Sequence, residues 1–96
     1  MNINGNVFSG PYSPFKGFDS VIAAVYAILD SRNTVIDVGQ SEDLNNRFPN
    51  HQRENCWRTH GIGDLGLYIL RENSEQNRLR IESGIRQRYN PLCGDR

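Results

Sequence analysis

Two short apolar segments separated by a polar turn constrain the fold of this chain more than any other feature. Residues 21–29 are almost all small or β-branched apolar residues, and residues 34–39 repeat this composition around one acidic residue. Only the four polar residues 30–33 lie between them, which is enough for a tight turn and little else. The pattern predicts an antiparallel hairpin whose first strand is buried on both faces.

Two polar side chains, Tyr26 and Asp37, interrupt these apolar strands. If Leu29 faces Thr34 across the turn, the register of the hairpin places Tyr26 directly opposite Asp37, where side chains are neighbours. A phenol and a carboxylate in a buried sheet both require hydrogen-bonding partners. We therefore expect Tyr26 and Asp37 to belong to a functional site.

The segment after the second strand carries the signals of a capped helix. Ser41 is a good N-cap residue, and two acids follow it in what would be the first turn. Arg47 and His51 are four residues apart and would share one face of that helix. Pro49 lies between them and lacks the N–H that a helix interior needs, so a kink or a restart is expected there.

The C-terminal half predicts a third strand and a long helix. Residues 65–70 form an apolar run, and Ser74 then caps a helix that must end before Pro91. On a helical wheel, the apolar side of this helix is formed by Leu79, Ile81, Ile85 and Tyr89.

Glu82 falls inside that apolar arc. A carboxylate that faces the core is costly unless it is paired with a cation or binds a metal ion. Arg78 and Arg86 each lie four residues from Glu82, so either could form an ion pair with it. From the residues alone, the ion pair and a metal-binding role are equal alternatives.

The length of 96 residues fits one domain. Residues 1–20 form an N-terminal arm rich in Gly, Pro, Ser and Asn, whose aromatic residues are expected to cover an edge or a face of the sheet. Residues 21–96 form the single domain. No apolar run approaches the roughly 20 residues that span a bilayer, and the first residues do not resemble a secretion signal. We therefore expect a cytoplasmic location and no membrane partner.

The two cysteines, Cys56 and Cys93, suit a reducing compartment, and the sequence is also compatible with a disulfide between them. A zinc site is a further alternative, because His60 follows Cys56 by four residues. That site would need Cys93 and His51 to reach four ligands. Trp57, next to Cys56, is expected to anchor the core.

The formal net charge of zero argues against a general electrostatic attraction to nucleic acid. The charge is unevenly spread, since residues 49–96 carry eight Arg against six acids, whereas residues 1–48 carry three basic residues against five acids. Arginine binds phosphate or carboxylate with two parallel hydrogen bonds. The basic half therefore predicts anion recognition, and a solvated surface is the alternative.

Taken in order, these residues resemble the GIY-YIG nuclease domain family. Residues 24–26 (Ala-Val-Tyr) and 37–39 (Asp-Val-Gly) stand where that family carries its two signature tripeptides, on the two strands of a hairpin. The remaining matched positions are Arg47, His51 and Glu82. The resemblance covers residues 21–94. It implies a small mixed α/β (α+β) fold with a central three-stranded antiparallel sheet flanked by helices.

The activity that the resemblance implies is hydrolysis of a nucleic-acid phosphodiester with one divalent cation, Mg²⁺ or Mn²⁺. Glu82 would be the metal ligand, and Arg47 would bind the scissile phosphate and stabilise charge that develops in the transition state. Tyr26 would act as general base or relay near the attacking water, with Asp37 accepting its proton or helping to activate the water. His51 would transfer a proton.

The partner that the resemblance implies is nucleic acid, with DNA preferred to RNA. Gly39, Gln40 and Arg47 would contact it. Because the chain has no room for a separate DNA-binding domain, specificity would come from the N-terminal arm, from a homodimer or from a protein partner.

Three positions depart from the family pattern. Ala24 replaces the first Gly, Asp37 replaces the second signature Tyr, and Gly94 stands where an Asn usually follows the metal-binding Glu by twelve residues. A carboxylate at position 37 would disfavour a tyrosinate and repel a phosphate. These departures leave two alternatives, a domain that binds nucleic acid or a protein partner without cleavage, and a structural module whose ion pairs tie helix to sheet.

Overall fold

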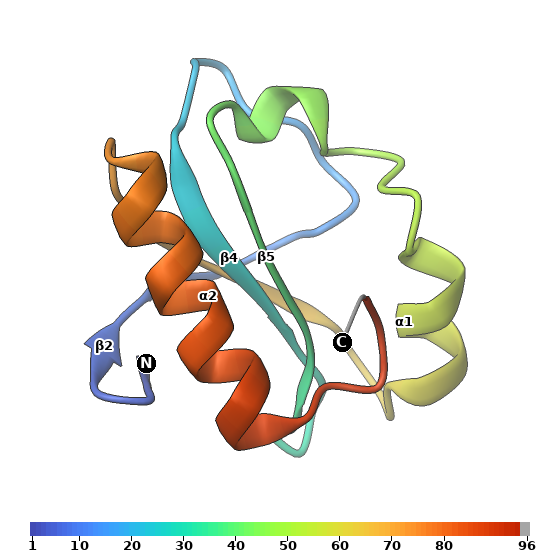
Figure 1. The fold of residues 1–96 in the computed structure, drawn as a ribbon. Helices are drawn as coiled ribbons and strands as arrows, with labels where there is room; N and C mark the ends of the chain where they lie inside the picture. Colours follow the sequence, from blue (N-terminus) through green and yellow to red (C-terminus); the bar gives the residue numbers. More distant parts are fainter. Residues whose placement is uncertain (95–96) are drawn as a thin grey trace.

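A four-stranded antiparallel sheet lies at the centre of the protein, whose computed structural model describes residues 1–94 (Figure 1). The strand order in this sheet is β3-β6-β4-β5. Its members are β3 (Ser9–Tyr12), β4 (Ala24–Leu29), β5 (Val35–Ser41) and β6 (Gly66–Arg71). A separate two-stranded hairpin consists of β1 (Asn2–Ile3) and β2 (Asn6–Val7). The expected mixed α+β class is confirmed.

The prediction of a three-stranded central sheet is wrong, because the N-terminal arm supplies a fourth strand. β3 pairs with the outer side of β6, with Ser9 opposite Ile69 and Tyr12 opposite Leu67. Pro11 lies within β3, and a residue without an N–H is tolerated in a sheet mainly on an edge strand. The Gly- and Pro-rich composition of residues 1–20 therefore gave no indication of this short edge strand.

The predicted pairing of Tyr26 with Asp37 is also wrong. Tyr26 lies opposite Gly39, and Asp37 lies opposite Ile28. The register differs by two residues in all, because the turn is one residue longer than expected and a bulge follows it between β4 and β5. Since side chains alternate with a period of two along a strand, a shift of two keeps Tyr26 and Asp37 on the same face of the sheet.

Asp30 explains the longer turn. Its buried carboxylate accepts hydrogen bonds from the backbone N–H groups of Arg32, Thr34 and Ile62 at 3.0, 3.1 and 3.0 Å. Burial alone would raise the pKa of this carboxyl, but the amide donors and the Arg32 guanidinium outweigh it and hold the pKa at about 2. The side chain thus connects the turn to the loop after the first α-helix.

The predicted helix beginning at Ser41 is wrong. Ser41 is the last residue of β5, and only a 3₁₀ turn, η1 (Leu44–Asn46), follows it. The N-cap of η1 is Asp43, whose carboxylate accepts from the Asn45 N–H. Sequence signals for a capped helix were present, but Ser41 instead pairs with Ala24 in the sheet.

Arg47 and His51 consequently do not share a helix face. Arg47 is the C-cap of η1, and residues 48–50, which include Pro49 and Asn50, separate it from His51. Pro49 cannot donate a helix hydrogen bond, and Asn50 has a φ of +67°, in the left-handed region. The chain therefore turns sharply between the two side chains.

Two α-helices complete the fold. α1 (Glu54–His60) follows η1 along the chain, and α2 (Glu75–Tyr89) begins at the Ser74 cap as predicted. The apolar arc of α2 is only partly correct. Ile85 is fully buried, whereas Leu79 and Tyr89 are exposed, and Arg78 occupies a buried position instead.

The sheet is covered on both faces. α2 crosses one face together with the β1–β2 hairpin, and the η1 and α1 segments pack against the other (Figure 1). Trp57 on α1 is completely buried, which confirms it as a core anchor. No helix among residues 1–94 is long and apolar enough to cross a membrane.

Cys56 and Cys93 form a disulfide that joins α1 to the segment after α2. The zinc alternative that used both thiols is therefore contradicted. Within the described part of the chain, no group of three or more His, Cys, Asp and Glu side chains is placed to hold a metal ion.

Candidate active site at the edge of the sheet

Tyr26 is a buried residue of β4 whose phenol reaches across β5, the outermost strand on that side of the sheet. The ring lies directly over Gly39. A Cβ at position 39 would come within 2.3 Å of the phenol oxygen and 2.4 Å of Cζ. Only glycine at this position lets the phenol oxygen approach the open edge of the sheet.

His51 holds the phenol oxygen. Its Nε2 lies 2.7 Å from Tyr26 Oη, and its Nδ1 accepts the Arg53 backbone N–H at 3.1 Å. Burial, aided by the Arg53 charge, lowers the pKa of His51 to about 4, so the imidazole is neutral at pH 7. A neutral imidazole that accepts at Nδ1 carries its proton on Nε2. We infer from this hydrogen bonding that His51 donates to Tyr26.

Arg53 also donates to the phenol oxygen of Tyr26, through Nη2 at 3.2 Å. Burial raises the pKa of Tyr26 to about 12, although the Arg53 and Arg47 charges oppose that rise. The phenol therefore keeps its own proton at neutral pH while its oxygen accepts two hydrogen bonds. Its O–H remains able to donate to a third group, such as a water molecule or a phosphate oxygen.

Asp37 is fully buried, and its carboxylate is saturated with donors. Oδ2 accepts from Arg53 Nε at 2.7 Å and from Trp57 Nε1 at 2.8 Å. Oδ1 accepts from Arg86 Nη2 at 3.2 Å and from the Val38 N–H at 2.8 Å. A carboxylate bound in this way serves as an anchor for two guanidinium groups, whose charges offset the cost of burying it.

Arg47 presents an exposed guanidinium next to this buried group. It makes no side-chain hydrogen bond or ion pair with any of residues 1–94. It lines a hollow of about 210 Å³ together with Asn46, Asn50 and His51. Its charge acts on the ionisation of both Tyr26 and His51. The side chain is thus placed to bind an anion beside the phenol.

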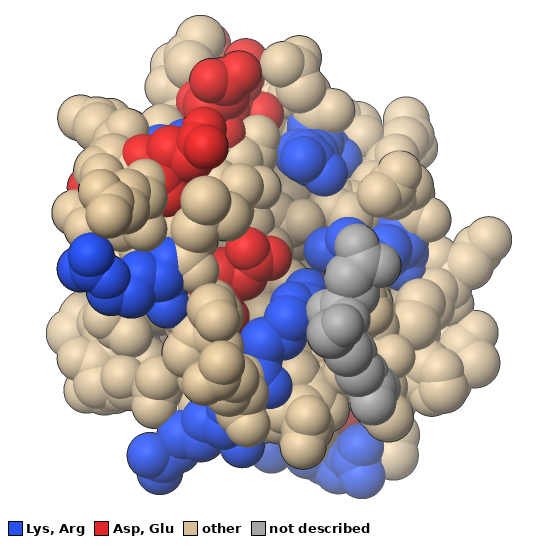
Figure 2. Space-filling view, viewed as in Figure 1, with Lys and Arg blue, Asp and Glu red and all other residues tan. Residues whose placement is uncertain are grey.

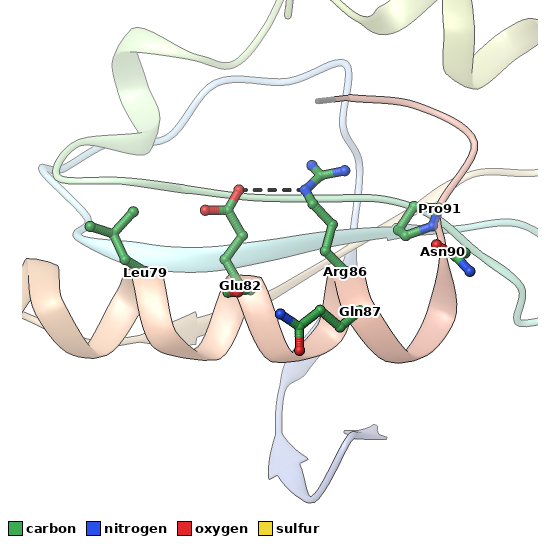
Figure 3. A pocket seen from close by; sticks show the side chains of 7 residues that line it. Leu79, Glu82, Arg86, Gln87, Asn90 and Pro91 are labelled. Atoms are coloured by element: carbon green, nitrogen blue, oxygen red, sulfur yellow. Dashed lines mark ion pairs between the residues drawn. The ribbon is translucent and has the colours of Figure 1, made fainter. Parts of the chain in front are cut away.

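Glu82 extends from α2 on the same side as Arg86 (Figure 3). The two side chains form an ion pair at 3.9 Å, so the ion-pair alternative for Glu82 is realised with Arg86, at a long distance. Burial raises the pKa of Glu82, and the neighbouring Arg86 and Arg53 charges oppose that rise. Glu82 lines a hollow of about 630 Å³ and lies close enough to Tyr26 to affect its ionisation.

Gln40 contacts Arg78. Its Oε1 accepts from Arg78 Nε at 2.9 Å, and Arg78 Nη1 donates to the Glu72 and Asn73 carbonyls. The buried Arg78 therefore ties the start of α2 to β5. Gln40 also lines a hollow of about 320 Å³ beside Arg47.

The donor set fits a cation that arrives with a phosphate better than a preformed metal centre. Within residues 1–94 no cluster of three ligand side chains exists, and the Asp37 oxygens are already occupied. Glu82 can offer its carboxylate. Mg²⁺ is often held by one or two carboxylates, water and substrate phosphate oxygens, so one half-buried Glu is sufficient for such a site.

On the face shown in Figure 2, the basic and acidic side chains of the described residues are interspersed. This agrees with the formal net charge of zero. Phosphate contacts at this face therefore depend on individual arginines.

Three residues of this network were missed by sequence reasoning. Arg53 and Trp57 contact Asp37, and Arg86, considered only as a partner of Glu82, does the same and also donates to the Val38 carbonyl. One signal was available, because a carboxylate on a buried strand requires cationic or N–H partners. Nothing in the spacing identified which ones.

The structure brings Tyr26, His51 and Asp37 into one hydrogen-bonded network, with Arg47 and Glu82 within electrostatic range of Tyr26. No family model and no curated protein matches this chain.

Proposed function

We propose that this protein is a metal-dependent endonuclease that hydrolyses nucleic-acid phosphodiester bonds, with a site of the GIY-YIG type. One observation carries the proposal. Side chains from three segments lie near the β5 edge: the buried phenol of Tyr26 on β4, Arg47 and His51 between β5 and α1, and Glu82 on α2. A neutral His, an exposed Arg and a half-buried carboxylate beside a phenol match the needs of phosphodiester hydrolysis.

In this proposal, Arg47 binds the scissile phosphate and stabilises the charge that develops on its oxygens. Tyr26 orients the attacking water, and His51 holds the phenol oxygen through Nε2. Because Tyr26 and His51 Nε2 both already carry a proton, the proton of the attacking water passes to solvent. Mg²⁺ or Mn²⁺, held by Glu82 and phosphate oxygens, would neutralise the phosphate and favour departure of the leaving oxygen. Because Asp37 is already saturated with donors, we assign it no part in proton transfer.

The substrate class in this proposal is DNA in preference to RNA. With a formal net charge of zero, affinity and specificity would come from the N-terminal arm, from a second copy of the chain or from a protein partner. A cytoplasmic location is also proposed. Because disulfides persist mainly in oxidising compartments, the redox state of Cys56 and Cys93 in cells tests that location.

A cleavage assay on plasmid and oligonucleotide substrates tests the activity. We expect cleavage with Mg²⁺ or Mn²⁺, none with EDTA, and a loss of at least 100-fold in Glu82→Gln and in Arg47→Ala, since each removes charge stabilisation of the transition state. Asp64→Asn and Arg80→Ala, at exposed positions, are matched controls that should retain activity. Equal residual cleavage in the wild type and both site variants would indicate contamination and refute the proposal.

A second candidate is binding of nucleic acid without cleavage. It is favoured by the pKa of about 12 for Tyr26, which keeps the phenol protonated. This candidate predicts that an oligonucleotide binds in a salt-dependent way, that binding weakens in Arg47→Ala, and that no metal produces cleavage. Metal-dependent cleavage lost in Glu82→Gln would exclude it.

A further inference from the structure

Two departures from the family pattern, Asp37 and Gly94, are neighbours in space. Gly94 has a φ of +93°, and a Cβ there would lie 2.8 Å from Asp37 Oδ1 and 2.5 Å from Arg86 Nη2. A side chain at position 94 would therefore collide with the Asp37–Arg86 ion pair. The two departures belong to one arrangement, in which a buried carboxylate and its arginines fill the space.

Arg53 connects this arrangement to the candidate catalytic groups. Its Nε donates to Asp37 Oδ2 at 2.7 Å, and its Nη2 donates to Tyr26 Oη at 3.2 Å. Its backbone N–H donates to His51 Nδ1 at 3.1 Å. One residue thus contacts the phenol, the imidazole that holds the phenol, and the buried carboxylate.

We propose that Arg53, anchored by Asp37, is a positioning residue that holds Tyr26 and His51 in the geometry used for phosphodiester hydrolysis. The catalytic part of this inference rests on the proposed function. The contact between Arg53 and Tyr26 is a property of the free protein and can be tested without any substrate.

Charge neutralisation of Asp37 does not by itself account for the position of Arg53. Arg86 already forms an ion pair with Asp37 on its other oxygen, and Trp57 shares Oδ2 with Arg53. The planar guanidinium of Arg53 uses a second nitrogen for Tyr26, which a point charge could not do at the same time.

The charges around Tyr26 come from three sides. Asp37 lies on β5, Arg47 and Arg53 lie on the segment between β5 and α1, and Glu82 lies on α2. Arg86 is paired with both of these carboxylates. Removing the Arg53 charge takes one cation and one hydrogen bond away from the phenol.

The first test is ¹³C NMR of protein labelled at tyrosine Cζ, with Tyr26 assigned from Tyr26→Phe. We expect Arg53→Gln to shift the Tyr26 resonance at pH 7. The matched control is Arg58→Gln, an exposed arginine on α1 five residues after Arg53, which should leave it unchanged. An unshifted Tyr26 resonance in folded Arg53→Gln would refute the inference.

The second test separates positioning from structural support through Arg53→Lys. Lysine keeps the ion pair with Asp37 but cannot contact Asp37 and Tyr26 in the bidentate manner of arginine. We expect Arg53→Lys to recover most of the stability lost in Arg53→Gln, while the Tyr26 resonance stays shifted and kcat stays at least tenfold low with little change in KM. A purely structural role predicts that Lys restores all three.

The two proposals fail in different ways. If the wild type does not cleave any substrate, the proposed function fails, and the NMR comparison still decides whether Arg53 holds Tyr26. If the wild type cleaves and Arg53→Lys matches its kcat and its Tyr26 resonance, the inference fails and the proposed function stands.

Discussion

Gly39 matters at the scale of single residues because the Tyr26 ring occupies the space where a side chain would lie. A Cβ there would approach the phenol to 2.3 Å, far inside van der Waals contact. We expect Gly39→Ala to displace Tyr26, to lower the free energy of unfolding by about 1–3 kcal/mol, and to abolish cleavage. Denaturant titration measures the stability.

The matched control for Gly39→Ala is Gly84→Ala on α2, where the nearest atom to a new Cβ is a side-chain nitrogen at 3.3 Å. Alanine is a better helix former than glycine, so this variant should be neutral or stabilising. Wild-type stability and activity in Gly39→Ala would contradict the position assigned to Tyr26.

Two buried groups predict how acid destabilises the fold. Burial lowers the pKa of His51 from 6.5 to about 4. Between these values the unfolded chain binds a proton that the folded protein does not, so stability falls as pH drops through this window. The pKa of Asp30 is lowered from 3.8 to about 2, so a second loss of stability follows as pH drops between those values.

Unfolding free energies measured from pH 8 to pH 2 test these two windows. His51→Gln should remove most of the pH dependence between pH 6.5 and pH 4, whereas His60→Gln, at an exposed position, should keep it. Asp30→Asn should remove the second window. Identical pH dependence in both His variants would contradict the burial and hydrogen bonding of His51.

The sequence proposes the candidate site residues but not their contacts. Tyr26, Arg47, His51 and Glu82 were proposed from their type and order, and Asp37 as a carboxylate on an apolar strand. The partners of Asp37 were not, because Arg53, Trp57 and Arg86 reach it from two helical segments that only tertiary packing brings together.

At the scale of elements, the strong apolar runs were predicted well. β4, β5 and β6 begin and end within three residues of the expected strands, and α2 follows its Ser74 cap. Local signals failed where tertiary pairing competed with them. Ser41 pairs with Ala24 instead of capping a helix, and the Asp30 side chain lengthens the turn.

The Cys56–Cys93 disulfide ties α1, which carries Trp57, to the segment after α2. It closes a loop with a sequence separation of 37 residues. Chain-entropy arguments give roughly 4 kcal/mol for a loop of this length. We expect reduction to lower the free energy of unfolding by about that amount, and to weaken cleavage because Trp57 and Gly94 both adjoin Asp37.

Stability with and without reductant measures this contribution. The double variant Cys56→Ser/Cys93→Ser is the control, and its stability should be low and insensitive to reductant. A wild type whose stability and activity do not change on complete reduction would contradict a structural role for the disulfide.

At the scale of the whole molecule, the site lies where segments from both faces of the sheet meet at one edge. The η1–α1 segment brings Arg47, His51 and Arg53 to β5 from one side, and α2 brings Glu82 and Arg86 from the other (Figures 1 and 3). The proposed phosphodiester hydrolysis would require a phosphate and a cation to occupy the space between these two groups.

The most direct test is a crystal structure of the protein with Mn²⁺ and a phosphorothioate oligonucleotide, read from the anomalous signal of manganese. We expect a manganese peak at the Glu82 carboxylate, a phosphate between it and Arg47, and Tyr26 Oη directed at that phosphate or its water. The peak should vanish in Glu82→Gln. Manganese bound elsewhere, or a phosphate that does not contact Arg47, would contradict the proposed site.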